Sequence, residues 1–169
     1  MNLKNIYAII ACDPKGTMGK EGKLPWHCPE DLEHFSKTTR NHIIVMGYRT
    51  FLSLPKSYFD QRIGIVFSRQ KHAKSERSNV IFLDSLEAFM ALEYLPKDKD
   101  CYVIGGAEIC KLFLKKNLIK EIILTQFNNL YEGDVFFPLL QIRTWHCQII
   151  QQFGAFTIYR YFNPVEVIQ

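Results

Sequence analysis

The chain has 169 residues, of which 47% are hydrophobic and 22% are charged, and its net charge is +4. These values predict one soluble globular domain over residues 1–169, and no apolar run reaches the roughly 20 residues that would cross a membrane. The positive charge is spread along the chain without interleaved aromatic residues, so nucleic-acid binding is not expected.

The first part of the chain alternates an apolar run, a glycine-containing loop and a helical pattern. Residues 6–11 are continuously apolar, which predicts a fully buried strand. Residues 13–23 contain Pro14 and several glycines, which predicts a mobile loop. A helix is expected from Pro29 to just before Asn41, because proline fits a first helical turn and acids beside it suit the helix dipole.

The rest of the chain continues the alternation of strands and helices. Buried strands are expected at residues 42–47, 62–68, 80–83, 100–104 and 118–127, and helices at 49–52, at about 86–94 after the capping Ser85, and from the glycines at 105–106 through Phe113. Strands at 145–153 and 156–162, joined at Gly154, predict a terminal hairpin. This order predicts an α/β fold with a mostly parallel sheet and an antiparallel hairpin at its edge.

The cysteines and the N-terminus indicate a compartment. The five cysteines are odd in number and lack the close spacing of a zinc or redox motif, so free thiols and no metal site are expected. The N-terminal residues lack the apolar core of a secretory signal. Both features favour a cytoplasmic protein, and a monomer is the default expectation.

Asp31 is the first residue that could carry chemistry. It lies beside Leu32 and one turn before Phe35, on the helix face expected to pack against the sheet. Burial there would raise its pKa, and hydrogen bonds to an amidine-like ligand would lower it again. From the residues alone, a first-turn acid that faces solvent, like Glu30, remains the alternative.

Three strand ends carry residues suited to phosphate. The segments are Gly47-Tyr48-Arg49-Thr50, Ser68-Arg69-Gln70 and Ile104-Gly105-Gly106-Ala107. Ligands of open α/β sheets bind beyond the carboxyl ends of strands, and a helix N-terminus attracts phosphate. The two adjacent glycines do not form the dinucleotide fingerprint, and a plain tight turn remains the alternative.

Taken together, these segments resemble the dihydrofolate reductase family over almost the whole chain and in the family's order. The most specific match is Leu24-Pro25-Trp26 followed by Asp31, combined with Ile104-Gly105-Gly106. The other matching motifs are Ile9-Ile10-Ala11, Met18-Gly19, Pro29-Glu30-Asp31-Leu32 with Phe35, Val45-Met46-Gly47, Arg49-Thr50-Phe51, Ser68-Arg69, Leu124-Thr125, Gly133-Asp134 and Phe137-Pro138.

The resemblance implies a three-layer fold, in which about four helices flank a central eight-stranded sheet. It implies NADPH-dependent reduction of 7,8-dihydrofolate to tetrahydrofolate, a reaction of one-carbon metabolism, and binding of antifolate inhibitors. Asp31 would bind and polarise the pterin, Thr125 would orient Asp31, and a water beside Leu24 would deliver the proton. Trp26 would also belong to the catalytic residues. The loop 13–23 would cover the cofactor.

The resemblance also implies two sets of binding residues. The substrate would be bound by Ile9, Ile10, Asp31, Leu32, Phe35, Leu54, Arg62, Ile104 and Thr125, with Arg62 on the glutamyl carboxylate. The cofactor would be bound by Ala11, Met18, Gly19, Gly47, Arg49, Thr50, Ser68, Arg69, Gln70, Ile104, Gly105, Gly106, Ala107, Glu108 and Ile109, with Ser68 and Arg69 on the 2′-phosphate.

The chain departs from the family at three places. Tyr48 stands where members carry a basic residue, Cys110 stands where they carry an aromatic one, and residues 55–61 lack the usual proline–glycine turn before Arg62. Two alternatives therefore stay open: the related pyrimidine reductase of riboflavin synthesis, and a non-catalytic binding descendant. The segment around Asp31 favours the pterin.

Overall fold

An eight-stranded sheet runs through the centre of the protein in the computed structural model, which describes residues 5–70 and 76–167. The strand order is β5-β4-β3-β6-β1-β7-β10-β9. The strands are β1 (Ile6–Cys12), β3 (Ile43–Gly47), β4 (Ile63–Phe67), β5 (Val80–Leu83), β6 (Cys101–Gly105), β7 (Glu121–Phe127), β9 (His146–Gln152) and β10 (Phe156–Phe162). The pairs from β5 to β7 are parallel and β10 is antiparallel to both neighbours, so the predicted sheet with its hairpin is confirmed.

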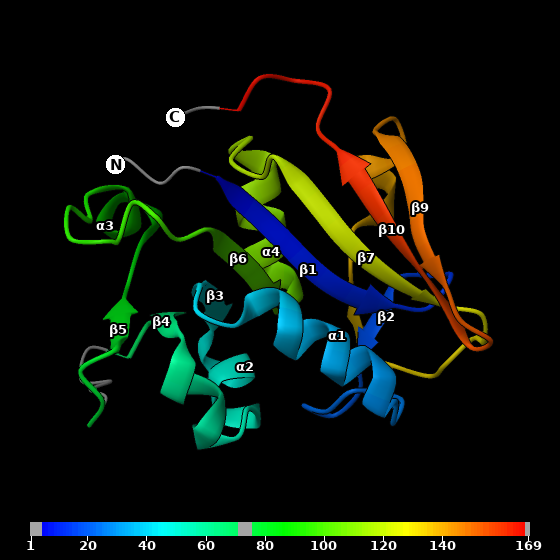
Figure 1. Ribbon diagram of the computed structural model, residues 1–169, viewed down its shortest axis with the longest axis horizontal. Helices are drawn as coiled ribbons and strands as arrows, with labels where there is room; N and C mark the ends of the chain where they lie inside the picture. The colour runs from blue at the N-terminus through cyan, green and yellow to red at the C-terminus, as the bar shows by residue number, and fades with distance from the viewer. Residues whose placement is uncertain (1–4, 71–75, 168–169) are drawn as a thin grey trace.

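Helices cover both faces of this sheet (Figure 1). The described residues form α1 (Pro29–Thr39), α2 (Tyr48–Ser53), α3 (Leu86–Met90) and α4 (Ala107–Lys115), with two 3₁₀ helices, η1 (Lys56–Gln61) and η2 (Leu139–Ile142). Ser85 caps α3 as expected, accepting a hydrogen bond from the Ala88 N–H. The prediction that this helix continues to Tyr94 is wrong: Tyr94 is 93% exposed, so no packing supports another turn.

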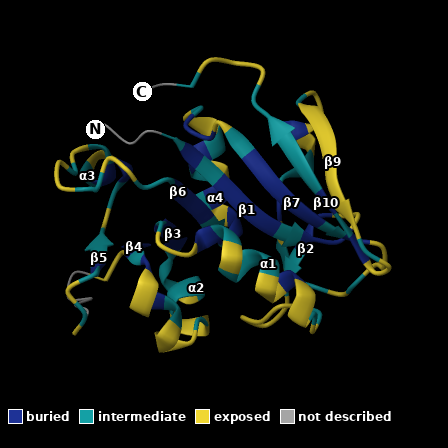
Figure 2. Cartoon of the chain, viewed as in Figure 1, coloured by how far each residue is buried: buried dark blue, intermediate teal, exposed yellow. Residues whose placement is uncertain are grey.

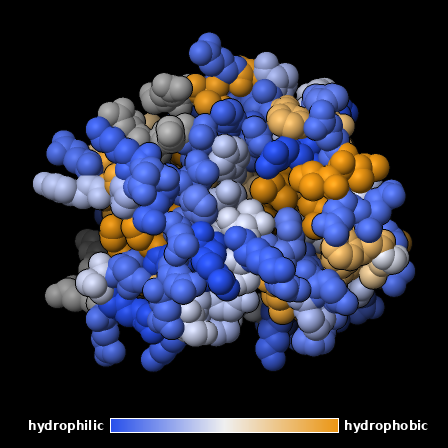
Figure 3. Space-filling model, viewed as in Figure 1, coloured by the Kyte–Doolittle hydropathy of each residue, from blue (hydrophilic) through white to orange (hydrophobic). Residues whose placement is uncertain are grey.

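The sheet separates two hydrophobic cores, because side chains alternate across each strand. Ile10, with Phe89 of α3 and Phe113 of α4, belongs to the core on one face. Ile9, with Phe35 of α1, belongs to the core on the other face. Burial is greatest in the central strands, whereas every residue of the edge strand β9 is exposed (Figure 2). On the α1 side, hydrophobic surface gathers over the β9–β10 end of the sheet (Figure 3).

The predicted loop at residues 13–23 contains a short strand. Residues Thr17–Gly19 form β2, which pairs antiparallel with β8 (Val135–Phe136) in a separate two-stranded sheet. The Phe137 N–H also donates to the carbonyl oxygen of Gly16 at 2.8 Å. The segment is therefore held against β8 and the residue that follows it.

The sheet opens between the carboxyl ends of β1 and β6. These strands pair only from Ile6 to Ala8 on β1 and from Cys101 to Val103 on β6. Beyond that point β1 continues its pairing with β7, while β6 continues with β3. Such an opening is where open α/β sheets bind ligands. Among the described residues, no helix combines the length and apolar character needed to cross a membrane.

Candidate active site

Asp31 is a buried carboxylate in the first turn of α1, with only 7% of the residue exposed. Burial raises the pKa of Asp31, and a hydrogen bond from the Thr125 side chain opposes this effect. Thr125 is itself buried on β7, where it pairs in register with Ala11 of β1. The neighbouring Glu30 is exposed. The alternative in which Asp31 faces solvent is therefore wrong.

Several partly exposed apolar residues lie on the face of the sheet that α1 covers. These predicted residues are Ala11, Trp26, Phe35, Leu54 and Ile104. Leu24 and Leu32 are more exposed, at 49% and 37%. Ile10 is buried on the opposite face, in the core that also holds Cys110, so the structure separates it from this set.

Trp26 contributes a buried donor as well as an apolar surface. Its ring centroid lies 4.4 Å from that of Phe127 and 5.3 Å from that of Tyr131. Its indole Nε1 is buried and has no hydrogen-bond partner among the described residues. Because buried donors are normally satisfied, this position suits a bound water or a ligand atom.

The glycines after β6 bring three predicted cofactor segments together. A Cβ on Gly105 would lie 3.6 Å from Met18 Cε and 3.8 Å from Thr50 Oγ1, and one on Gly47 would lie 3.4 Å from a side-chain carbon of Ile109. Gly105 has a φ of +126°, which favours glycine. The turn therefore lies next to β2 and α2, and Gly47 at the end of β3 lies next to α4.

The N-terminus of α4 follows directly from this turn. Gly106 is its N-cap residue and no side chain caps the helix there. Ala107 is buried, so its backbone rather than its side chain could meet a ligand. Glu108 is paired with Lys111 at 3.5 Å and its side chain is exposed, so only its backbone N–H suits an anion. Uncapped N–H groups at a helix N-terminus bind phosphate.

The predicted 2′-phosphate residues follow β4. The Ser68 hydroxyl oxygen accepts a hydrogen bond from the Gln70 N–H at 3.1 Å, while Arg69 and Gln70 are exposed. The Tyr48 ring packs against the rings of Phe51 and Phe82, so it lies within an aromatic cluster. Of the basic residues near these strand ends, Arg69 lies beside Ser68 and Arg49 lies in α2.

Cys110, the second departure from the family pattern, is fully buried in α4. Burial raises the pKa of the Cys110 thiol to about 12, so the group is protonated near neutral pH. It acts there as a small apolar core residue. All five cysteines are free thiols, as expected.

Arg62 is a buried cation at the start of β4, with 7% exposure. Its Nε donates to the Thr39 hydroxyl at 2.9 Å, Nη1 donates to the Tyr58 carbonyl at 2.8 Å, and Nη2 donates to the Ser36 carbonyl at 2.8 Å and hydroxyl at 3.2 Å. Among the described residues no carboxylate pairs with it. These bonds fix the guanidinium between α1 and η1, where it faces a pocket.

Asp13 is a buried polar residue that the sequence analysis missed. Its carboxylate accepts hydrogen bonds from the N–H groups of Lys15 at 2.9 Å, Thr17 at 2.8 Å and Tyr131 at 2.9 Å. It therefore joins the β1–β2 turn to the segment whose Tyr131 ring contacts Trp26. The Asp-Pro-x-Gly pattern at residues 13–16 is a turn signal that could have indicated it.

We expect Asp13→Asn to destabilise the protein by about 1.5–3 kcal/mol at pH 7, because it weakens hydrogen bonds to a charged acceptor. Although burial acts to raise it, the pKa of Asp13 is lowered by the backbone N–H groups of Tyr131, Thr17 and Lys15. The ionised carboxylate therefore stabilises the fold above the unfolded pKa of about 3.9, and this stabilisation is lost as the pH falls through the lower folded value.

Urea unfolding of wild type and Asp13→Asn from pH 3 to 7 tests this prediction. The difference in the free energy of unfolding should shrink below about pH 4. Asp98→Asn, which changes an exposed aspartate, is the matched control and should stay within about 0.5 kcal/mol. A difference that does not change with pH would contradict the prediction.

Comparisons with known proteins agree with the resemblance found in the sequence motifs. A family model described as Dihydrofolate reductase matches residues 5–157. A dihydrofolate reductase of Haemophilus influenzae is 34% identical over 140 residues, covering 83% of this chain and 82% of that protein. One of Lactococcus lactis is 32% identical over 133 residues, covering 79% and 77%. A putative dihydrofolate reductase of Caenorhabditis elegans is 35% identical over 146 residues, with the same coverage.

Proposed function

Because the chain belongs to the dihydrofolate reductase family, we propose that it reduces 7,8-dihydrofolate to 5,6,7,8-tetrahydrofolate with NADPH as the hydride donor. The observation that carries the proposal is the buried Asp31 beside Thr125, at the inner edge of a partly exposed apolar surface. A pterin has a planar ring system whose faces can pack between apolar side chains, and its edge carries an amino group next to a ring nitrogen. A carboxylate in an apolar site is the matching acceptor for that pair.

The glycine turn is what supports a dinucleotide cofactor. Glycine at positions 105 and 106 leaves open the space next to Thr50 and Met18 that a side chain would fill. The uncapped N-terminus of α4 adds N–H donors for a pyrophosphate. Ser68 and the exposed Arg69 would hold the 2′-phosphate that distinguishes NADPH from NADH. When bound, NADPH supplies the hydride.

The chain itself would position the nicotinamide and the substrate ring and would exclude water from between them. Ala11, Met18 and Ile104 would contact the nicotinamide side, while Phe35 and Leu54 would enclose the substrate ring. The opening between β1 and β6 would let the two rings meet at reacting distance. The β2–β8 pairing would hold Met18 and Gly19 over the site, so the 13–23 segment would act as its cover.

The reduced ring also needs a proton on the nitrogen next to the carbon that accepts the hydride. A water at the unpaired Trp26 Nε1, admitted beside the exposed Leu24, would deliver it. Asp31 would hold the pterin through its amino group and ring nitrogen, and its charge would favour protonation of the ring. The hydrogen bond from Thr125 would keep the Asp31 side chain in place for this role.

Arg62 and the free cysteines bear on the substrate tail and on the cellular compartment. Arg62 would pair with the glutamyl carboxylate, which its fixed planar donors suit. Antifolate inhibitors with an amidine-like ring would use Asp31 in the same way. Five free cysteines support an enzyme of the reducing cytoplasm. A monomer is the default expectation.

A single assay tests the proposed function. We expect oxidation of NADPH that depends on dihydrofolate, with NADH a poorer donor. A ribosylated pyrimidine from riboflavin synthesis, the substrate of the rival reductase, should give no turnover. No oxidation with dihydrofolate would reject the proposal, and binding of folate and NADPH without turnover would favour the non-catalytic descendant.

A further inference from the structure

Trp26 lies between β2 and α1, outside the described helices and strands, so the direction of its indole ring depends on side-chain contacts. Its ring belongs to a cluster of three. The centroids of Trp26 and Phe127 are 4.4 Å apart with an interplanar angle of 31°, whereas those of Trp26 and Tyr131 are 5.3 Å apart at 63°. Phe127 and Tyr131 also meet edge to face, at 6.2 Å and 86°. Each ring therefore contacts the other two.

Phe127 is the member of this cluster that the central sheet holds. It is buried at the end of β7, and its ring lies 5.4 Å from that of Phe156, its neighbour in register on β10. Offset stacking against this one ring does not by itself fix how far the indole slides or turns in its own plane. A second ring at a steep angle removes that freedom, and Tyr131 supplies it.

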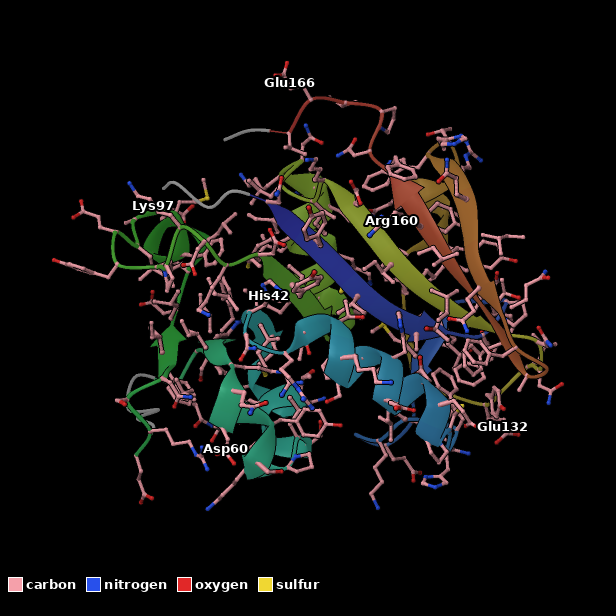
Figure 4. All side chains as sticks on the ribbon, in the orientation of Figure 1. His42, Asp60, Lys97, Glu132, Arg160 and Glu166 are labelled. Atoms are coloured by element: carbon pink, nitrogen blue, oxygen red, sulfur yellow. The ribbon has the colours of Figure 1, made fainter. Side chains whose placement is uncertain are left out.

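Tyr131 is held in place by a buried carboxylate. It lies in the connection between β7 and β8, where Figure 4 labels the next residue, Glu132. The Tyr131 N–H donates to Asp13 Oδ2 at 2.9 Å, while Asp13 Oδ1 accepts from two N–H groups of the turn after β1 at 2.9 and 2.8 Å. Asp13 is 0% exposed, so water does not compete for these charge-assisted bonds. The exposed Glu132 side chain pairs instead with Lys20 at 3.0 Å.

These contacts lead to the atom at which we place the water that delivers the proton. The Trp26 Nε1 is buried and has no partner among the described residues, so a water there would complete its hydrogen bonding. A proton donor must lie within hydrogen-bond reach of the atom that it protonates. A small rotation of the indole would move Nε1 and its water together. Whatever fixes the indole therefore also fixes the source of the proton.

We propose that Tyr131 is a positioning residue for proton delivery. Asp13 holds its backbone, and its ring fixes the Trp26 indole so that the water at Nε1 stays within reach of the substrate nitrogen. The inference rests on the proposed function. It assigns the role to the ring of Tyr131 rather than to its hydroxyl, because the ring makes the contact with Trp26. Phenylalanine should therefore replace Tyr131, and leucine should not.

The kinetic test measures single-turnover NADPH oxidation from pH 5 to 9 in wild type, Tyr131→Leu, Tyr131→Phe and Tyr159→Leu. Tyr159 is half-buried like Tyr131 and contacts another ring, but it packs against the core on the opposite face. Tyr131→Leu should be about fivefold slower than wild type at pH 9, the factor that one edge-to-face aromatic contact is worth. At pH 5, where substrate protonated in solution bypasses the water, it should come within about twofold.

The other two variants are the controls for this effect. Tyr131→Phe keeps the ring and should follow wild type at every pH, as should Tyr159→Leu. The Kd of dihydrofolate should be unchanged in Tyr131→Leu, since Asp31 and Arg62 hold the substrate. A single-turnover rate constant does not depend on the fraction of enzyme that is folded, so a loss of stability does not imitate the expected change.

A second measurement follows the indole without requiring turnover. The chain has two tryptophans, so in a Trp145→Phe background the fluorescence comes from Trp26 alone. The decay of its fluorescence anisotropy reports how freely the ring moves. We expect Tyr131→Leu to increase the fast local component of this decay and Tyr131→Phe to leave it unchanged.

The two measurements separate the remaining outcomes. A rate loss in Tyr131→Leu that is equal at pH 5 and pH 9 overturns the inference, since Tyr131 would then support the hydride step or the fold. Unchanged motion of Trp26 in Tyr131→Leu also overturns it. Failure of wild type to oxidise NADPH with dihydrofolate rejects the proposed function, whereas the anisotropy decay still decides whether Tyr131 fixes the indole.

Discussion

Asp31→Asn is expected to lower the rate of dihydrofolate reduction at pH 7 by about 10²–10⁴-fold, the range associated with loss of a positioned acid–base group. Asparagine keeps the size of the side chain but presents an uncharged amide to the pterin. The ring then lacks the negative charge that favours its protonation. Substrate already protonated in solution can replace this effect, so the variant's rate should rise about tenfold for each unit the pH falls.

The raised pKa of Asp31 predicts that Asp31→Asn does not lose stability, in contrast to its loss of activity. Burial penalises the ionised form, so the folded pKa lies above the unfolded value and ionisation costs stability as the pH rises through this interval. Asp31→Asn removes that cost. The variant without ligands should be as stable as wild type at pH 7 or more stable, which separates lost catalysis from lost folding.

The control for Asp31 lies next to it in the sequence. Glu30→Gln removes a carboxylate from the same helical turn, but Glu30 is exposed, so its rate should stay within about twofold of wild type. Single-turnover NADPH oxidation from pH 5 to 9, together with urea unfolding, measures both expectations. Unchanged rates in Asp31→Asn, or equal losses in both variants, would refute the role assigned to Asp31.

Glu30 and Asp31 show that a local sequence pattern does not predict which of two neighbouring acids is buried. Both are acids in a first helical turn, and pattern alone favoured solvent for each. Only the family resemblance singled out Asp31, and the structure confirms that it is buried while Glu30 is exposed. Burial depends on how the helix packs against the sheet, which a local pattern does not determine.

Strands were predicted well where apolar runs are buried on both sides, since such runs have no competing local structure. The strand predicted at residues 42–47 matches β3 to within one residue, and four of the five β3 residues are buried. The strand predicted at residues 156–162 matches β10, although most of its residues are only half-buried. The strand predicted from Leu118 begins instead at Glu121, because the Leu118 N–H donates to the Phe113 carbonyl and closes the end of α4. Short β2 and β8 were not predicted, since their pairing joins distant parts of the chain and carries little local signal.

The missed polar residues have the same explanation. The Asp13 carboxylate is held by hydrogen bonds from three backbone N–H groups, one of which comes from the distant Tyr131. Arg40 lines a pocket only because η1 and the start of β4 place Asp60 and Arg62 beside it. In both cases the residue type was ordinary, and the tertiary neighbours supplied the information that points to a role.

Gly133→Ala is expected to slow hydride transfer by tenfold or more. The added methyl group would force β2 away from the segment that precedes β8, and these segments hold the proposed cover of the site, residues 13–23. A Cβ at this position would lie 2.5 Å from the carbonyl oxygen of Gly19 and would also collide with the Thr17 side chain. A backbone oxygen cannot rotate away, so β2 must move. A misplacement of about 1 Å near a reacting centre can cost roughly 100-fold in rate.

The position of β2 links this clash to the chemistry. The Gly19 carbonyl accepts a hydrogen bond from the Asp134 N–H at 3.0 Å, and the Met18 methyl lies near Gly105, in the turn proposed to hold the cofactor. A shift at Gly19 would therefore move Met18 and weaken the contact with the cofactor that we propose for it. The loss should appear in the single-turnover rate and in NADPH affinity more than in dihydrofolate affinity, because Asp31 and Arg62 belong to other elements.

Gly154→Ala is the matched control for Gly133→Ala. Gly154 lies in the β9–β10 turn, and a Cβ there would meet no atom within 4 Å. Its single-turnover rate should equal that of wild type, whereas Gly133→Ala should also lose about 1–3 kcal/mol of stability through overpacking. Measuring hydride transfer at pH 7 and at saturating NADPH removes any effect of weakened cofactor binding. If Gly133→Ala then transfers hydride at the wild-type rate, the β2–β8 pairing does not position the cover, and Met18 has no part in aligning the two rings.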